Sequence, residues 1–220
     1  MKSELPKTGR RQKQKEETRS IILDAARSLF SEIGFADTTI RKIAKKAEVG
    51  FGTVFNHFPD KSSLLIAALI DDLVKTQADA MVSFPSDVSV RDKFLYLSKQ
   101  FFLYYAKNPD LSRTLIKEMW FVKGEWGEIF KDQADQYLLL ITEIIDEGKK
   151  KGEIKEDVIS SIAAASFFSQ YYSVLLMGLN EEVFKPDDLV VILKMMIDQI
   201  VDGIGSGMGD EQDNEIEGKG

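Results

Sequence analysis

The sequence predicts an all-α fold of about nine helices, organised in two parts. From residue 18 onward, apolar residues recur at the spacing of three and four that is typical of amphipathic helices. No segment alternates polar and apolar residues as a half-buried strand would, and no Asn-Gly pair indicates a hairpin. Charge is unevenly divided, because residues 1–62 carry 13 basic and 8 acidic side chains and the remainder carries 16 and 28. We therefore expect a basic N-terminal unit joined to an acidic body.

The composition excludes several kinds of site. The chain has 220 residues, of which 44% are hydrophobic, and this is enough for a buried core. It contains no cysteine and one histidine, His57, so disulfides, thiolate nucleophiles and metal sites with several histidines are excluded. We expect no catalytic residues, no metal and no cofactor. The charged N-terminus does not resemble a secretory signal, which favours a cytoplasmic location.

The basic unit, residues 18–62, is predicted to contain three helices. They are expected over residues 18–34, 38–48 and 51–57. Gly34 suits the end of the first helix, Thr38 or Thr39 supplies an oxygen to cap the second, and Pro59 stops the third. The second and third helices are short and are joined by a tight turn that contains glycine, which indicates a helix-turn-helix. Such a pair can place its second helix in the major groove of double-stranded DNA.

The first 17 residues are predicted to form a mobile basic arm. They hold six basic side chains and almost no apolar surface to offset the entropy of ordering. Two interpretations remain open for this arm. It is either a solvated terminus, or a segment whose Arg10, Arg11 and Lys13 contact DNA phosphates or a minor groove.

The acidic body, residues 63–203, is predicted to be entirely helical. Asp60 can cap a helix over about 61–82 that links the basic unit to the body. Further helices are expected over 90–107, from Pro109 toward Gly124, over 125–151, over 156–179, and from Pro186 onward. Residues 204–220, rich in glycine and acidic residues, are predicted to be a disordered tail, either native or left from expression.

The last two helices of the body are predicted to form half of a symmetric four-helix dimer interface. Residues 158–180 carry no charge and are long enough to cross a bilayer, but their serines are too polar for a lone span in lipid. We therefore expect a buried helix and no membrane partner, with small residues that let another helix approach. The predicted interface residues are Ile162, Ser166, Ser169, Ser173, Leu189, Leu193, Met196, Ile197 and Ile200.

Residues 18 to about 72 resemble the DNA-binding domain of the TetR family of transcriptional regulators. The resemblance rests on the order and spacing of Ile-Leu-Asp-Ala-Ala-Arg-Ser-Leu-Phe, Gly-Phe-Ala-Asp-Thr-Thr-Ile-Arg-Lys-Ile-Ala and Gly-Thr-Val-Phe-Asn-His-Phe-Pro-Asp-Lys. It implies a homodimer that binds a palindromic DNA operator and releases it when a small molecule enters the body. Repression is the usual mode in this family.

The resemblance also implies which residues contact DNA. Transferred by position, they are Thr38, Thr39, Arg41, Gly50, Phe51, Gly52, Thr53, Phe55, Asn56, His57 and Lys61. Among them, Lys61 resembles a phosphate-binding lysine, Arg41 suits a guanine edge and Asn56 suits an adenine edge. His57 is equally compatible with a core position.

The chain departs from the usual family pattern at Gly50, Phe51 and Phe55. Phe55 replaces a tyrosine and loses a phosphate hydrogen bond, whereas Phe51 can cover a thymine methyl group. The phosphate contacts are therefore expected to depend more on the basic arm and on Lys42, Lys45 and Lys46.

The body is rich in aromatic residues and methionine, which indicates a small apolar or aromatic effector. Most such residues form ordinary core, but some are expected to line a cavity, with tyrosine hydroxyls, Gln170 or Asn180 as polar contacts. The predicted ligand-binding residues are Phe102, Tyr105, Met119, Trp120, Trp126, Tyr137, Phe168, Tyr171 and Tyr172. A tilt of the linking helix would couple the cavity to DNA binding by changing the spacing of the two recognition helices.

Two other functions are compatible with parts of the sequence. One is a ligand-binding interaction protein with a degenerate DNA-binding unit, which Phe51 and Phe55 would permit. The other is a helical-bundle enzyme that uses carboxylates of the body, although it would lack the Glu-x-x-His pairs of di-iron proteins because the only histidine lies in the basic unit.

Overall fold

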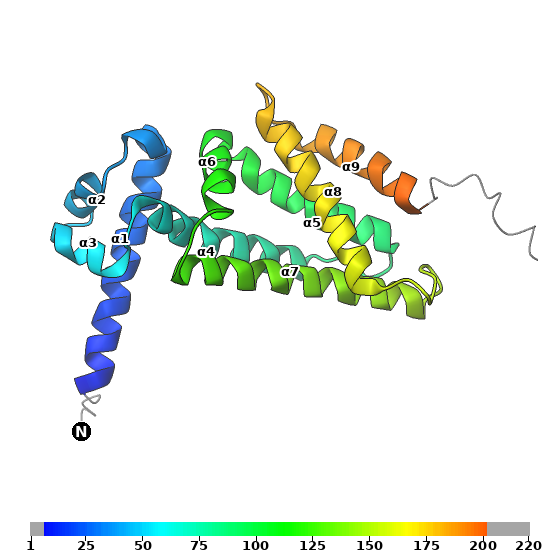
Figure 1. The fold of residues 1–220 in the computed structure, drawn as a ribbon, viewed down its shortest axis with the longest axis horizontal. Helices are drawn as coiled ribbons and strands as arrows, with labels where there is room; N and C mark the ends of the chain where they lie inside the picture. Colours follow the sequence, from blue (N-terminus) through cyan, green and yellow to red (C-terminus); the bar gives the residue numbers. More distant parts are fainter. Residues whose placement is uncertain (1–6, 202–220) are drawn as a thin grey trace, which may run out of the picture.

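The computed structural model describes residues 7–201, which form nine α-helices (Figure 1). The helices are α1 (Lys7–Asp37), α2 (Ile40–Lys46), α3 (Phe51–His57), α4 (Lys61–Val82), α5 (Val90–Ala106), α6 (Pro109–Met119), α7 (Glu125–Lys150), α8 (Ser160–Asn180) and α9 (Pro186–Val201). The all-α prediction is confirmed. The predicted tail, residues 204–220, and residues 1–6 lie outside the described residues.

Local capping residues fix where four of the helices begin. The side chains of Thr39, Asp60, Ser89 and Asn108 each accept a hydrogen bond from a backbone N–H of the first turn that follows. In this way each cap satisfies one of the N–H groups that a helix start leaves without a partner. Gly124, which precedes α7, has φ 73°, a conformation that suits glycine.

The N-terminal helix begins earlier than predicted and is interrupted at the glycine where it was predicted to end. It begins at Lys7, so residues 7–17 are the first turns of α1 and not a separate arm. Pairs at helical spacing support these turns, including Gln12 with Glu16 at 2.9 Å and Lys13 with Glu17 at 3.9 Å. At the other end Gly34 leaves the helical conformation, with φ 78° and ψ 167°, and kinks the chain toward α2.

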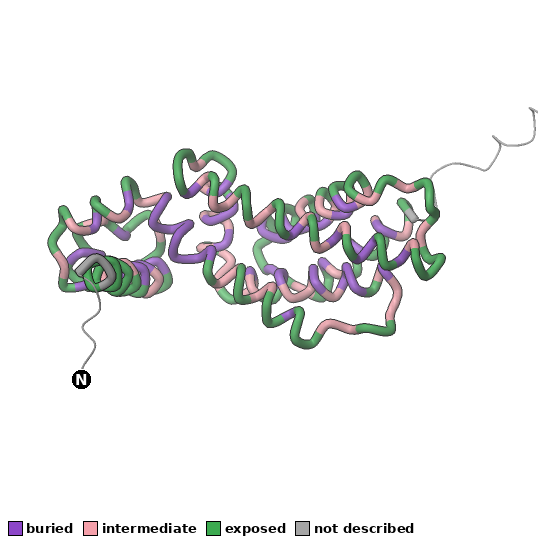
Figure 2. Tube along the Cα trace, turned by 90° about the horizontal axis from the view of Figure 1, so that it is seen from below, coloured by how far each residue is buried: buried purple, intermediate pink, exposed green. Residues whose placement is uncertain are grey.

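The helices are arranged as two parts joined by α4. Helices α1–α3 form one end of the molecule, and α5–α9 form the other (Figure 1). Figure 2 shows that buried residues also occupy the junction between the two ends. A single apolar core runs from Ile22 in α1 to Ile197 in α9. Helices α1–α3, the recognition unit, are therefore packed onto the body and are not tethered by a free linker.

Three contacts hold this junction. The Arg27 guanidinium of α1 donates to the Ala68 carbonyl of α4 at 2.5 Å. The Ser62 hydroxyl of α4 donates to the Glu118 carboxylate of α6. The ring of Phe58, directly after α3, lies 5.6 Å from the ring of Trp126 at the start of α7, measured between centroids.

Helix α8 is the only described helix that is long and apolar enough to cross a membrane by length and composition. It packs against α7 and α9, and Gly178 allows a close approach, since a Cβ there would lie 2.5 Å from a methyl carbon of Leu189. Only 39% of the long apolar stretch of this helix is buried within the protomer. This is the pattern of a helix with one face in the core and one face uncovered.

The predicted dimer residues divide between these two faces. Leu189, Leu193 and Ile197 are buried inside the protomer, at 5%, 0% and 0% exposure, so their predicted interface role is wrong. They pack inward because α9 turns its apolar stripe toward its own bundle. The uncovered surfaces of the two helices instead carry Ile162, Ser169, Ser173, Met177, Val191, Met195 and Ile200. Ser166 and Met196 are half-buried.

Candidate nucleic-acid interface and effector cavity

The outer face of α3 carries two exposed phenylalanines. Phe51 is 46% exposed and Phe55 is 44% exposed, and their rings meet edge to face with centroids 4.8 Å apart. The guanidinium of Arg41, on α2, lies 5.8 Å from the centre of the Phe51 ring. On the opposite face of α3, Val54 is fully buried. The helix therefore presents an apolar ridge with a cation beside it, a combination that suits thymine methyl groups and a guanine edge.

The start of α3 is open to close approach from outside. Gly50 is the N-cap residue, and a Cβ on Gly52 would meet nothing within 4 Å in the described residues beyond its chain neighbours and the backbone of its own helix. Packing inside the protein therefore does not require a glycine at position 52. Its bare backbone instead leaves room for a surface to approach α3 from outside. Thr39, exposed at the start of α2, uses its oxygen to cap that helix at 3.2 Å from the Lys42 nitrogen.

Two residues predicted to contact DNA point into the protein. Thr38 is fully buried, and its hydroxyl donates to the Gly34 carbonyl at 2.7 Å. The ammonium of Lys61 contacts the carbonyl oxygens of Phe35, Ala36 and Thr38 at 2.6, 3.3 and 3.1 Å. Because these three contacts use its donors, Lys61 fixes the turn after α1 and the prediction of a phosphate-binding lysine is wrong.

The second half of α3 forms a hollow with α1. Thr53, Asn56 and His57 line it together with Arg11, Gln12, Gln14, Lys15 and Thr18 of the first helix. The pKa of His57 lies below its usual value, first because the ring is partly buried and then because Lys15 and Arg19 are close. At neutral pH the ring is therefore uncharged, and the charge of this hollow comes from α1. The sequence did not indicate that Lys15 and Thr18 lie beside α3, since only the packing of α1 brings them there.

The three lysines of α2 differ in their contacts. The Lys46 ammonium pairs with Glu32 at 2.7 Å, and this pair lowers the pKa of the Glu32 carboxyl. The Lys42 ammonium donates to the Asp37 carbonyl at 2.9 Å. Lys45 is exposed. Of the three, Lys45 is therefore the most suitable for a phosphate contact.

A narrow cavity of about 90 Å³ lies inside the body. Five helices contribute to its wall: Ile70, Leu73 and Gln77 from α4; Phe101 and Tyr105 from α5; Ile116, Met119 and Trp120 from α6; Phe130, Gln133, Ala134 and Tyr137 from α7; and Phe168, Tyr171, Tyr172 and Leu175 from α8. None of these residues carries a charged side chain. The exposed Trp120 and the half-buried Phe130, Phe168 and Tyr172 mark the more open end, and Tyr105, Tyr137 and Tyr171 are buried at the inner end.

Seven of the nine predicted ligand-binding residues line this cavity. The other two predictions were wrong. Phe102 is fully buried and stacks behind Tyr171, with ring centroids 5.3 Å apart. Trp126 packs against Phe58, and the Arg19 guanidinium lies 5.2 Å from its ring centre, so it belongs to the junction between the two ends. The prediction missed the aliphatic wall and Phe101, because spacing along one helix does not tell which helix faces it.

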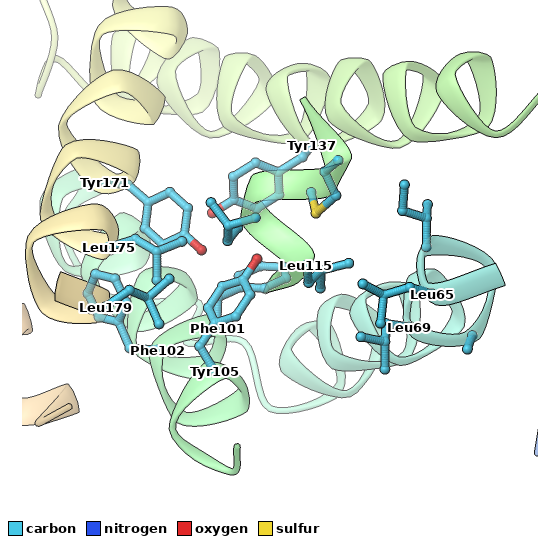
Figure 3. Packing of buried hydrophobic residues seen from close by; sticks show 14 of the residues in the cluster. Leu65, Leu69, Phe101, Phe102, Tyr105, Leu115, Tyr137, Tyr171, Leu175 and Leu179 are labelled. Carbon is cyan, nitrogen blue, oxygen red and sulfur yellow. The ribbon is translucent and has the colours of Figure 1, made fainter. Parts of the chain in front are cut away.

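The inner end of the cavity holds three tyrosine hydroxyls, which point toward a common space (Figure 3). A hydrogen bond joins the hydroxyls of Tyr105 and Tyr171. The Tyr137 hydroxyl is buried and has no hydrogen-bond partner. Burial is the main reason that the pKa of each of the three lies above the usual value. All three are therefore neutral donors and acceptors in an otherwise apolar space.

The cavity adjoins the helices that hold the recognition unit. Met119 and Trp120, at the end of α6, line the cavity, and Glu118 on the same turn accepts the hydrogen bond from Ser62 of α4. Helix α4 also lines the cavity through Leu73, while its first half is buried against the core shared with α1. A change in the shape of the cavity would therefore act directly on α4 and α6.

A short exposed recognition helix, a basic flank and an apolar cavity define a DNA-binding protein with a ligand-binding body. Residues 22–68 match the sequence pattern of the bacterial regulatory proteins of the tetR family. The resemblance that the sequence predicted for this part of the chain is therefore confirmed.

Similar proteins extend this likeness along most of the chain. The fatty acid metabolism regulator protein of Bacillus subtilis is 24% identical over 193 residues, covering 87% of this chain and 98% of its own. FadR of Bacillus subtilis, solved in complex with stearoyl-CoA, superimposes with a TM-score of 0.65 at 23% identity, covering 84% of this chain and 99% of its own. FadR of Thermus thermophilus, a repressor solved with lauroyl-CoA, gives a TM-score of 0.69 at 22% identity, covering 85% and 95%.

Proposed function

We propose that the protein is a DNA-binding transcriptional regulator that responds to a small effector, and that it acts as a repressor in the cytoplasm. The observation that carries this proposal is the outer face of α3, where Phe51, Phe55 and the neighbouring Arg41 are exposed beside the open backbone at Gly52. Residues 18–62 form the DNA-binding unit, and residues 63–203 form the body that binds the effector and a second copy. We assign the chain no catalytic role.

The protein forms a homodimer through the uncovered faces of α8 and α9, and this dimer binds DNA. Small residues on α8, Ser169 and Ser173, are exposed next to larger apolar residues such as Ile162 and Met177. On α9, Val191 and Met195 are 59% and 61% exposed. An apolar surface of this kind, with small residues that allow close helix packing, fits a second copy of the same face. Two-fold symmetry then places two α3 helices on the halves of a palindromic operator.

The effector is an apolar molecule, for which a long-chain acyl-CoA is the first candidate. Two solved relatives carry stearoyl-CoA and lauroyl-CoA, and the uncharged wall of the cavity suits an acyl chain. A cavity of about 90 Å³ is narrow for such a chain, so binding must move the helices that line it. Movement of α4 and α6 would change the distance between the two recognition helices and lower DNA affinity.

Selection of bound DNA from a random pool tests the proposed function. We expect an enriched palindrome whose half-sites lie about one helical turn, roughly 34 Å, apart, with binding that weakens as salt rises. Lauroyl-CoA or stearoyl-CoA added to the complex should then release the DNA. An absence of enrichment at low salt would contradict DNA recognition, and release by neither ligand would contradict this class of effector.

The second candidate function is a ligand-binding interaction protein that no longer reads DNA. The exposed ridge of Phe51 and Phe55 favours it, because an apolar pair on the surface also suits a protein partner. The same selection separates the two candidates. Retention of DNA without sequence preference, at affinities that salt alone determines, would favour the interaction protein.

A further inference from the structure

The hydroxyl of Tyr137 is a donor without an acceptor. The residue is 6% exposed and lines the cavity, and no atom of residues 7–201, the part that the structure describes, accepts its hydrogen. Buried polar groups are normally hydrogen-bonded, so each exception calls for an explanation. Here the exception lies in the wall of a cavity and not in solid core. An acceptor on a bound molecule would satisfy it.

The neighbouring hydroxyls add a second free donor. The hydroxyls of Tyr105 and Tyr171 hydrogen-bond to each other, and this bond uses only one of their two hydrogens. When Tyr171 is the donor, the hydrogen of the Tyr105 hydroxyl is left for another acceptor. Tyr105 and Tyr137 reach the same space from α5 and α7, on facing sides of the cavity (Figure 3). An oxygen placed between them would accept two hydrogen bonds.

The rest of the wall decides what kind of oxygen fits. The lining residues include no lysine, arginine or histidine, and the tyrosines are themselves neutral. A carboxylate or phosphate in this position would be buried without a counter-charge, which is costly. A carbonyl oxygen has two lone pairs and no charge, and it therefore matches two phenol donors in an apolar cavity.

We propose that Tyr105 and Tyr137 form a carbonyl-binding subsite, so that the effector is an apolar molecule with a neutral carbonyl group in its buried part. This proposal rests on the proposed function in one respect: the ligand of the subsite is the effector to which the regulator responds. Two sources share this chemistry. The carbonyl belongs either to the thioester of an acyl-CoA or to a small ketone, free of any large head group.

Two matched pairs of probes test the subsite by isothermal titration calorimetry, without DNA. Lauroyl-CoA is compared with S-dodecyl-CoA, which has a thioether in place of the thioester and so lacks the acyl carbonyl. Valerophenone is compared with pentylbenzene, which differs from it only at the carbonyl. In the wild-type protein the carbonyl member of at least one pair should bind about fivefold to tenfold more tightly than its partner, as expected for a neutral hydrogen bond. The pair that shows the preference identifies the source.

The Tyr137→Phe variant should lose this preference. Its affinity for the probe that lacks the compared carbonyl should equal that of the wild type. Its midpoint of thermal unfolding should equal or exceed that of the wild type, because the hydroxyl that it removes has no partner. Tyr96→Phe is the matched control. The Tyr96 hydroxyl lies 3.4 Å from the Ala80 carbonyl and is not part of the cavity wall, so this variant should keep the preference.

Three results would overturn the subsite. These are a wild-type protein that binds both members of each pair equally, a wild-type protein that binds neither carbonyl probe, and a Tyr137→Phe variant that keeps the full preference. The proposed function fails on a different measurement, namely the selection of DNA and its release. If the protein prefers the carbonyl probe but does not release DNA, the subsite is supported and the regulatory role is contradicted.

Discussion

Two groups of aromatic side chains in this molecule have opposite exposures. Phe51 and Phe55 on α3 are nearly half exposed and contact each other on the outside of the recognition unit. In the body, Tyr105, Tyr137 and Tyr171 are at most 6% exposed and surround a cavity. The exposed pair is suited to contact with another macromolecule, whereas the buried group can receive only a molecule small enough to enter. Burial separates the two groups, and the buried one also carries the hydroxyls that the exposed phenylalanines lack.

The two regions also differ in how far apart in sequence their contacts lie. Helices α2 and α3 are seven residues each and are joined by a short turn, so their geometry is set within about twenty residues. The cavity draws its wall from five helices between Ile70 and Leu175. A motif in the sequence can therefore identify the first region but not the second. Substitutions in each region test this division between a surface formed locally and an interior assembled from distant helices.

The phenylalanines at the end of α3 should differ most in their effect on stability. Phe58 is fully buried against Trp126, so Phe58→Ala should lower the free energy of unfolding by about 3–5 kcal/mol. Phe55→Ala removes an exposed ring and should change it by less than about 0.5 kcal/mol. Urea denaturation followed by circular dichroism measures both. Equal costs would mean that the recognition unit is not packed onto the body.

Substitutions at two lysines should distinguish a lysine with a structural role from a lysine that contacts DNA. Lys61→Met leaves three carbonyl oxygens without their ammonium partner and should destabilise the fold by roughly 1–3 kcal/mol. Lys45→Met, at an exposed position of α2, should leave stability unchanged. It should instead reduce the slope of log affinity against log salt by about one. If Lys61→Met changed the salt slope while stability stayed the same, its phosphate-binding role would be restored.

The exposed ridge on α3 should read a thymine methyl group. Phe51→Ala should weaken binding to the selected operator by about 1 kcal/mol, close to the value of one buried methylene, without a change in unfolding. Replacing the contacted thymine by uracil should weaken wild-type binding by a similar amount and should not affect the variant. A wild-type protein that binds both operators equally would exclude this contact.

The smallest effect should come from His57 and should depend on pH. Because partial burial and the nearby Lys15 and Arg19 lower the pKa of His57, the unfolded chain binds a proton at a higher pH than the folded chain. Protonation therefore favours the unfolded state, and stability should fall as pH drops through the ordinary value of 6.5. Above that value the group makes no difference. His57→Gln should have a flatter dependence of melting temperature on pH, and an unchanged curve would show that other groups cause it.

The sequence by itself determined the order of the helices and where several of them begin. Thr39 and Asp60 cap the helices that they were expected to cap, and Ser89 and Asn108 cap the next two. A capping bond spans only three residues and does not depend on the rest of the fold. The recognition helix was predictable for the same reason. Its apolar spacing and its glycine turn are local, and the family resemblance lies within them.

Only the tertiary structure decided which way the ambiguous side chains point. Lys61 and Thr38 turn inward to carbonyl oxygens of the preceding segment, and Trp126 packs against the recognition unit rather than the cavity. The unpartnered hydroxyl of Tyr137 became apparent only when α5, α7 and α8 were brought together. Periodicity tells which residues share a face of a helix. It does not tell what that face meets, because the partner lies on a helix far away in the sequence, and its position depends on the packing of the whole core.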